Sequence, residues 1–155
     1  MTALWDWAVE VYAKPGAREA CLNLQDGHDQ NVPYLLWAAW AAQTGRKLDA
    51  ETLEAGVDTA RAWDGAAVRP LRAIRNTLKK PIPDLDDAAR EAVREQVKAV
   101  ELQAERRLLE ALETLSPEPD SPPRPMLQAL AEAARAFSPT VPRAALDTLV
   151  AALSA

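Results

Sequence analysis

The chain has 155 residues, of which 48% are hydrophobic and 26% are charged, and its formal net charge is −5. Its single cysteine excludes an intramolecular disulfide, and the lack of an apolar run of about 18 residues argues against a membrane span. The acidic balance disfavours nucleic acid and anionic membranes as partners, because both attract cationic proteins. The first residues lack the basic region of a signal peptide, so we expect a soluble, cytoplasmic protein.

The composition favours helices over strands. Alanine occurs 32 times and isoleucine only twice, and alanine is the best helix former, whereas strands favour β-branched residues. The segments between prolines and glycines repeat apolar residues every three or four positions. We therefore predict an all-α protein: a compact multi-helix bundle with one long helix and a C-terminal helical hairpin after a proline-rich linker.

The first helices are predicted at about residues 2–13, 15–26 and 31–44, with a turn at residues 26–29. The third is apolar on all sides, which predicts a central, buried helix. Asp49 is expected to cap a fourth helix that ends near Trp63. A fifth helix is predicted to follow and end near Lys80, and Pro70 within it requires either a late start near Arg69 or a kink.

A long helix is predicted to begin among Asp84, Asp86 and Asp87, because acidic residues suit a helix start, and to end near Leu115. At about 1.5 Å per residue it spans roughly 45–50 Å, which is longer than a compact domain of this size needs. We expect part of it to project, or to pack against the C-terminal region or a second subunit. Its predicted apolar seam is Leu85, Ala89, Val93, Val97, Val100, Ala104, Leu108, Ala111 and Leu115.

The sequence divides into a helical body (residues 1–115), a proline-rich linker (116–125) and a helical hairpin (126–155). The linker composition predicts an extended, semi-rigid segment. The hairpin is amphipathic but too small to be stable alone, so it docks either on the body or on a partner. We expect truncation after Leu115 to leave a folded but less soluble body.

The sequence contains no recognisable catalytic or metal-binding constellation. His28 lies in a predicted turn and Cys21 on the apolar side of a predicted helix, and neither has ligand partners at metal-site spacing. The three aspartates at the start of the long helix are explained as helix caps. We therefore expect no metal and no cofactor.

Aromatic residues concentrate near the N-terminus, since all five tryptophans fall within the first 63 residues. Such a cluster indicates either an aromatic core or a ligand pocket. Trp37, Trp40 and Trp63 are the candidates for the pocket.

Basic residues concentrate on the predicted fifth helix. At about 100° per residue, Arg69, Arg72, Arg75 and Lys79 form a stripe about 120° wide. Solvated surface, internal ion pairs and an anion- or partner-binding site all fit this pattern. In a hairpin centred on Ile82, most of the stripe would face no internal counterion. We then expect the arginines to make an intermolecular anionic contact, and their replacement by glutamine to change stability by less than about 1 kcal/mol.

The order and spacing of a set of residues along the chain indicate a family resemblance. The set resembles an uncharacterised proteobacterial family, a domain of unknown function. The resemblance covers roughly residues 4–115, and the linker and hairpin lie outside it. It implies a bacterial origin and a cytoplasmic location, but no activity, ligand or catalytic residue. The residues are Trp5, Tyr12-Ala13, Pro15-Gly16, Cys21-Leu22-Asn23-Leu24-Gln25, Gly27, Asn31-Val32-Pro33, Leu35-Leu36, Trp40, Gly45, Trp63, Val68-Arg69-Pro70-Leu71-Arg72, Arg75, Leu78-Lys79 and Glu101-Leu102-Gln103-Ala104-Glu105-Arg106.

These patterns favour a non-catalytic helical interaction or adaptor protein with a protein partner, and leave a homo-oligomer open. The alternative is a small-molecule binding protein that holds an amphipathic anion, phosphorylated or acyl, with its tryptophan-rich N-terminal helices and the stripe from Arg69 to Lys79. An enzyme that uses His28 or acidic residues has the least support.

Overall fold

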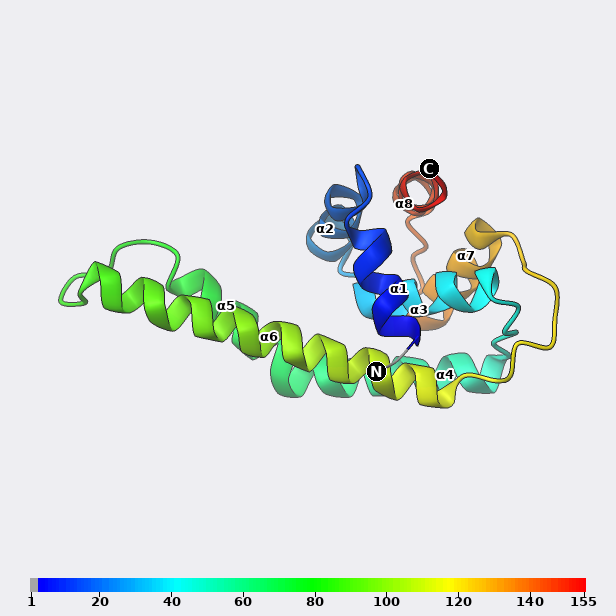
Figure 1. Ribbon diagram of the computed structural model, residues 1–155, viewed down its shortest axis with the longest axis horizontal. Helices are drawn as coiled ribbons and strands as arrows, with labels where there is room; N and C mark the ends of the chain where they lie inside the picture. Colours follow the sequence, from blue (N-terminus) through cyan, green and yellow to red (C-terminus); the bar gives the residue numbers. More distant parts are fainter. Residues whose placement is uncertain (1–2) are drawn as a thin grey trace.

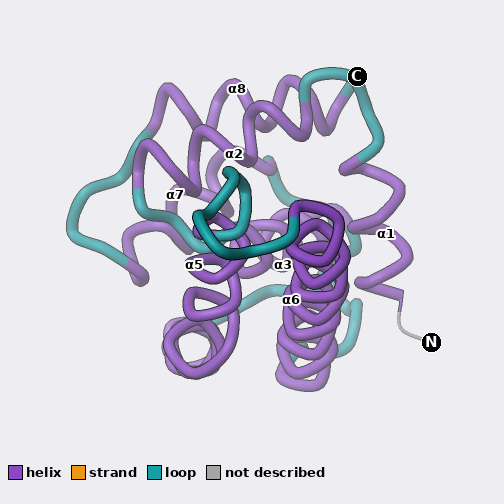
Figure 2. Tube along the Cα trace, turned by 90° about the vertical axis from the view of Figure 1, so that its left-hand side faces the viewer, coloured by secondary structure: helices purple, strands orange, loops and turns teal. Residues whose placement is uncertain are grey.

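The computed structural model describes residues 3–155, which form helices joined by loops and contain no strand (Figures 1 and 2). The predicted all-α fold is confirmed. The elements are α1 (Ala3–Tyr12), α2 (Ala17–His28), α3 (Val32–Gln43), α4 (Ala50–Trp63), the π-helical turn η1 (Asp64–Val68), α5 (Arg69–Thr77), α6 (Asp87–Leu115), α7 (Met126–Phe137) and α8 (Arg143–Ser154).

Helix α3 is the centre of the body. Eleven of its 12 residues are buried, and Tyr34 and Trp37 are fully enclosed. Helices α1, α2, α4, α6 and α7 all pack against it, because a helix that is apolar all round must be covered on every side. The predicted central helix is confirmed.

Helix α2 is longer than the sequence suggested. It continues through Gly27 to His28, past the start of the predicted turn. It ends because Asp29 adopts a left-handed conformation with φ 51°, and the N–H of Asp29 donates to the carbonyl of Leu24.

Helices α4 and α5 follow one another through η1, just before Pro70. Proline has no N–H to donate and its ring excludes a regular helical turn before it. The backbone instead makes a π-type bond, from the N–H of Arg69 to the carbonyl of Asp64. Of the two arrangements expected around Pro70, the structure has the late start of α5 at Arg69.

The long helix α6 projects from the body (Figure 1). Its 29 residues begin after Asp86, whose carboxylate accepts the N–H of Ala89 at 2.8 Å, as predicted for a capping aspartate. Every buried apolar residue of α6 lies at or beyond Ala104. Val93 and Val100, in the predicted seam, are 50% and 49% exposed. We call the projecting unit, α5 with the loop 78–86 and residues 87–103 of α6, the arm.

The C-terminal hairpin docks on the body of its own chain. Helix α7 packs on α3 and α4, and α8 packs on α2. Leu130 and Leu146 are fully buried, and the hydroxyl of Tyr34 donates to the carbonyl of Ala133 at 2.8 Å. Helices α7 and α8 therefore complete the core around α3, and truncation after Leu115 would expose this helix. We now expect such a truncated chain to lose cooperative folding.

The linker is held against the body. The N–H of Ser121 donates to the carbonyl of Gly45 at 3.0 Å, and that of Arg124 donates to Ala42 at 2.9 Å. Gly45 has φ 73°, and a Cβ there would collide with the backbone of Ser121, so only glycine suits this position. The linker thus closes over the C-terminal end of α3.

The packing of the hairpin predicts that Leu130→Ala destabilises the whole protein. Removal of a fully buried leucine side chain costs about 2–5 kcal/mol, and the melt should stay a single transition because α7 shares the core of α3. Leu127→Ala, at a partly buried position of the same helix, should cost less. Differential scanning calorimetry measures both, and two separate transitions would contradict a shared core.

Candidate functional site

The predicted basic stripe is largely neutralised within the chain. The guanidinium of Arg69 contacts the carboxylate of Asp64 and lies 2.7 Å from that of Asp29. The hydrogen bond to Asp64 and the charges of both aspartates raise the pKa of Arg69 above its ordinary value. Arg69 therefore bridges Asp29, at the C-terminal end of α2, and Asp64 of η1.

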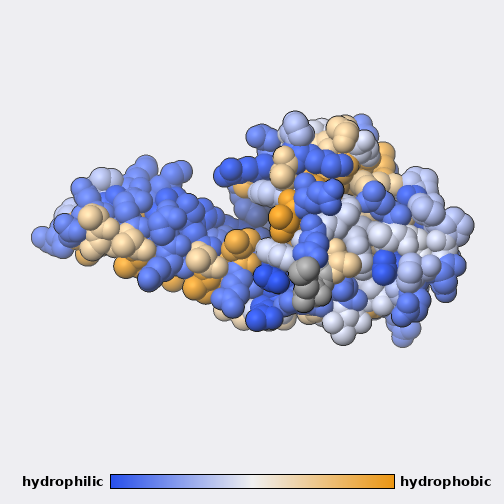
Figure 3. Space-filling view, viewed as in Figure 1, coloured by the Kyte–Doolittle hydropathy of each residue, from blue (hydrophilic) through white to orange (hydrophobic). Residues whose placement is uncertain are grey.

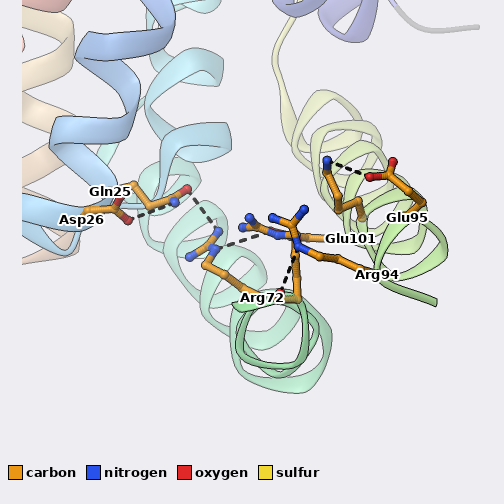
Figure 4. A network of polar contacts seen from close by, with 8 residues as sticks. Gln25, Asp26, Arg72, Arg94, Glu95 and Glu101 are labelled. Carbon is orange, nitrogen blue, oxygen red and sulfur yellow. Dashed lines mark hydrogen bonds and ion pairs between the residues drawn. The ribbon is translucent and has the colours of Figure 1, made fainter. Parts of the chain in front are cut away.

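Arg72 and Arg75 share a single buried carboxylate, that of Glu101 (Figure 4, where Arg72 and Glu101 are labelled). Arg75 lies 2.6 Å and Arg72 3.4 Å from Glu101 on α6. Arg72 also donates to the side-chain oxygen of Gln25 on α2 at 3.1 Å. The expectation that the stripe lacks internal counterions is wrong.

The counterions were missed because α5 lies against α6 in a different register from the one expected. A hairpin centred on Ile82 would bring Arg75 opposite Ala89. Instead, the Nε of Arg94 donates to the carbonyl of Arg75 at 3.3 Å, and the long side chains reach further still, to Glu101. Of the four basic candidates, Lys79 alone makes no ion pair with any described residue.

None of the three aromatic candidates lines the polar cleft or the apolar groove described below. Trp37 is fully buried, and its indole N–H donates to the hydroxyl of Ser116 at 2.7 Å. Trp40 is 3% exposed, with the guanidinium of Arg46 stacked 4.2 Å from its ring centroid. Trp63 is partly buried against the core. These side chains belong to the packing of the body.

A polar cleft lies where α2, η1, α5 and α6 meet the start of α3. Its volume is about 370 Å³. Neutral polar side chains, among them Gln25, Gln30 and Asn76, also contribute to the wall. The charged side chains that line it are Asp26, Asp29, Asp64, Glu105, Arg69 and Arg72.

Glu105 is the most perturbed acid of this cleft. Burial raises the pKa of its carboxyl to about 7, the negative charge of Glu101 adds to the effect, and Arg72 and Arg75 oppose it. No described residue donates a hydrogen bond to Glu105. The Glu105 carboxyl therefore changes between its protonated and ionised forms around neutral pH, whereas an ordinary surface glutamate is ionised there.

An apolar groove adjoins the cleft. It has a volume of about 250 Å³ and lies between α1, α6 and the start of α3. Trp5, Tyr12, Leu36 and Leu102 are among its lining residues. Val32, Pro33 and Glu105 line both hollows, so the groove and the cleft share a wall.

Between residues 89 and 106 of α6, the charged side chains and almost all the uncharged ones lie on different sides of the helix. At about 100° per residue, a sector about 160° wide contains no charge, and all the charged residues fall in the remaining sector. Leu102 is the only apolar residue of the charged sector and is 56% exposed. We call the first sector the uncharged face; it comprises Ala89, Ala92, Val93, Gln96, Val97, Ala99, Val100, Gln103 and Ala104.

Other chemistry receives no support from residues 3–155. Burial raises the pKa of the Cys21 thiol to about 12, so the thiol stays protonated and unreactive. His28 is exposed. In this range there is no group of three His, Cys, Asp or Glu side chains placed to hold a metal ion, and no helix has both the length and the apolar character to cross a membrane.

Comparison with known proteins identifies a family. A family model described as "Protein of unknown function (DUF2390)" matches residues 3–112. The chain therefore belongs to this family, as the ordered residues of the sequence predicted, and α7 and α8 lie beyond the matched segment. No curated protein and no solved structure matches the chain significantly.

The shared carboxylate predicts a stability loss that a surface stripe would not show. The double substitution Arg72→Gln and Arg75→Gln leaves Glu101, 9% exposed at its side chain, without a counterion and should cost about 3–5 kcal/mol. Arg69→Gln, at a side chain that is 56% exposed, should cost less than about 1 kcal/mol. Urea melts measure both, and adding Glu101→Gln to the double variant should restore much of the loss. A double variant as stable as Arg69→Gln would show that Glu101 does not depend on the pair.

Glu105 predicts a pH-dependent stability. The unfolded chain releases this proton near pH 4.5 and the folded chain near pH 7, so folding becomes less favourable as the pH rises between these values. Glu105→Gln should therefore stabilise the protein by roughly 1–3 kcal/mol above about pH 8 and change little below about pH 4. Urea melts across this range test the sign, and a variant that is less stable at high pH would contradict it.

Proposed function

We propose that this member of the DUF2390 family is a non-catalytic interaction protein whose arm binds a helix of a partner protein. The observation that carries the proposal is the uncharged face of α6. On an ordinary exposed helix, charged residues occur on the solvent side. Here a sector without charge spans residues 89–104, although most of this stretch lies in the projecting arm.

Exposed apolar side chains on the arm support this proposal. Val93 and Val100 are each about half exposed and lie two helical turns apart on the uncharged face. Ile74 on α5 and Leu85 in the loop are 48% exposed. Apolar surface follows the lower edge of the arm in Figure 3. An apolar strip of this kind, bordered by alanine and glutamine, suits the apolar face of another helix.

The arm is stiffened by polar contacts on its other side. The buried guanidinium of Arg90 donates to the carbonyl of Leu78 at 3.1 Å, Arg94 donates to Arg75, and Glu101 joins both helices. These contacts hold α5 on α6 without using the uncharged face. A rigid surface loses little conformational entropy on binding, which favours a binding role for this face.

The proposal includes a bacterial, cytoplasmic setting, which the resemblance of the sequence implies. An amphipathic anion fits the stripe less well than a partner helix fits the arm, since Arg69, Arg72 and Arg75 already contact carboxylates. A second copy of the chain is one form the partner helix can take, and the experiment below includes that outcome.

Charge placed on the uncharged face should abolish partner binding. The experiment is an affinity pull-down with tagged protein from the native host. The wild type should recover a partner in stoichiometric amount, and the double variant Val93→Lys plus Val100→Lys should not, because each lysine would have to be desolvated in the interface. Both valines are half exposed, so the variant should melt within a few degrees of the wild type. Native mass spectrometry of the purified protein reports whether the partner is a second copy.

The matched control is Glu91→Gln plus Glu95→Gln, which changes net charge equally but lies in the charged sector of α6. It should keep the partner. Equal recovery by both variants, or loss with the control alone, would contradict the proposal.

A further inference from the structure

The cleft and the apolar groove adjoin, and we treat them together as one amphipathic slot. They meet at Glu105, Val32 and Pro33, which line both. The cleft offers charged and hydrogen-bonding groups, whereas the groove offers aromatic and aliphatic side chains. Ligand sites commonly combine an apolar enclosure with a few convergent polar groups. The slot lies on the body side of α6, apart from the uncharged face.

The charge of the cleft favours a cation. Four carboxyl groups line it against two guanidinium groups, and both arginines already contact carboxylates of the chain. Adding Arg75 and Glu101, which lie next to the lining residues, gives five carboxyl groups against three guanidinium groups, so the excess of two carboxyl groups remains. An excess of negative charge in a recess attracts positive ligands and repels anions.

The unused polar atoms of the cleft are acceptors. Glu105 receives no hydrogen bond from any described residue. Gln30 is 6% exposed, and its side-chain oxygen is buried with no hydrogen-bond partner. A buried acceptor without a donor is costly, so a ligand that brings N–H donors gains at Gln30, and the partly buried carboxylate of Glu105 offers a second acceptor. An ammonium group has three donors and no acceptor.

The start of α3, which also borders the cleft, is a weak anion site. Asn31 accepts the N–H of Tyr34 at 3.0 Å, and Pro33 has no N–H. Two of the donors that usually attract anions to a helix start are thus removed.

The groove supplies the apolar half. Leu102 is 56% exposed although its neighbours on that side of α6 are charged. It faces a groove lined also by Trp5, Tyr12 and Leu109. In Figure 3, apolar surface appears in the notch where the arm meets the body. A hydrocarbon chain beside Leu102 would remove this surface from water.

We propose that the slot binds a small amine with an apolar tail, its ammonium group beside Glu105 and Gln30 in the cleft and its tail in the groove against Leu102 and Trp5. The ligand class is opposite in charge to the anion that the arginine stripe suggested. The site is independent of the partner helix proposed for the arm.

Isothermal titration calorimetry with n-octylammonium chloride near pH 8, below its micelle concentration, tests the site on the full chain. Octylammonium should bind at one site, and octanoate should bind at least about tenfold more weakly because of the carboxylates. From butyl- to octylammonium, each added methylene should tighten binding about two- to fourfold until the groove is filled. Octanoate binding as tightly as octylammonium would overturn the proposal.

Two variants locate the ends of the ligand. Glu105→Gln should weaken octylammonium binding at least about tenfold, and its expected gain in stability excludes unfolding as the cause. Leu102→Ser should flatten the dependence on chain length. Glu95→Gln and Leu85→Ser are the matched controls, because they remove an exposed acid and an exposed leucine outside the slot. Equal affinity of Glu105→Gln and the wild type would place the ligand elsewhere and overturn the inference.

Discussion

Helix α3 has no polar side, and this constraint determines the arrangement of the other helices. Because 11 of its 12 residues are buried, neighbouring helices must cover it all round, and α1, α2, α4, α6 and α7 do so. The second half of α6 meets this need with Ala104, Leu108 and Leu112. The first half has no α3 to cover, so it extends beyond the body with α5 against it.

An arm outside the core needs other interactions to keep its shape. The carboxylate of Glu101 supplies one of them, since Arg72 and Arg75 of α5 both contact it. Gln25 connects Arg72 to α2, and Arg69 connects η1 to Asp29. The three arginines thus act as internal connectors, between the two helices of the arm through Glu101 and between the arm and the body through Gln25 and Asp29. The uncharged face of α6 stays available for a partner, and the acceptors of the cleft stay available for a donor ligand.

Local sequence signals predicted the helices well, because caps and breakers act within a few residues. Asn31, Asp49 and Asp86 accept N–H groups at the starts of α3, α4 and α6. Long-range features were harder to predict. The partners of Arg72 depend on the register of α5 on α6, which the loop at 78–86 leaves open. At Gly56, glycine suggests a weakened helix, but a Cβ there would collide with Trp37, so the residue permits close packing.

The candidate site shows the same division. The apolar seam of α6 was visible in the sequence, but only the position of the body shows that Val93 and Val100 remain exposed. For Glu105 the sequence offers one indication, its position next to Leu102, which is the only apolar residue in the charged sector of α6 between residues 89 and 106. The cleft itself combines residues from α2, η1, α5 and α6, which no local pattern brings together. Trp37 and Trp40 show the opposite case: their clustering near the N-terminus suggested a ligand pocket, but both are buried in the core.

The most direct measurement of the central claim is a photo-crosslinking scan around α6 in the native host. A photoreactive residue is placed in turn at Val93, Gln96 and Val100 on the uncharged face and at Glu91, Glu95 and Lys98 in the charged sector. We predict that the yield of crosslinked partner follows the helical period, high at the first three positions and low at the others. Equal yields all round the helix, or a maximum in the charged sector, would contradict a partner helix on the uncharged face.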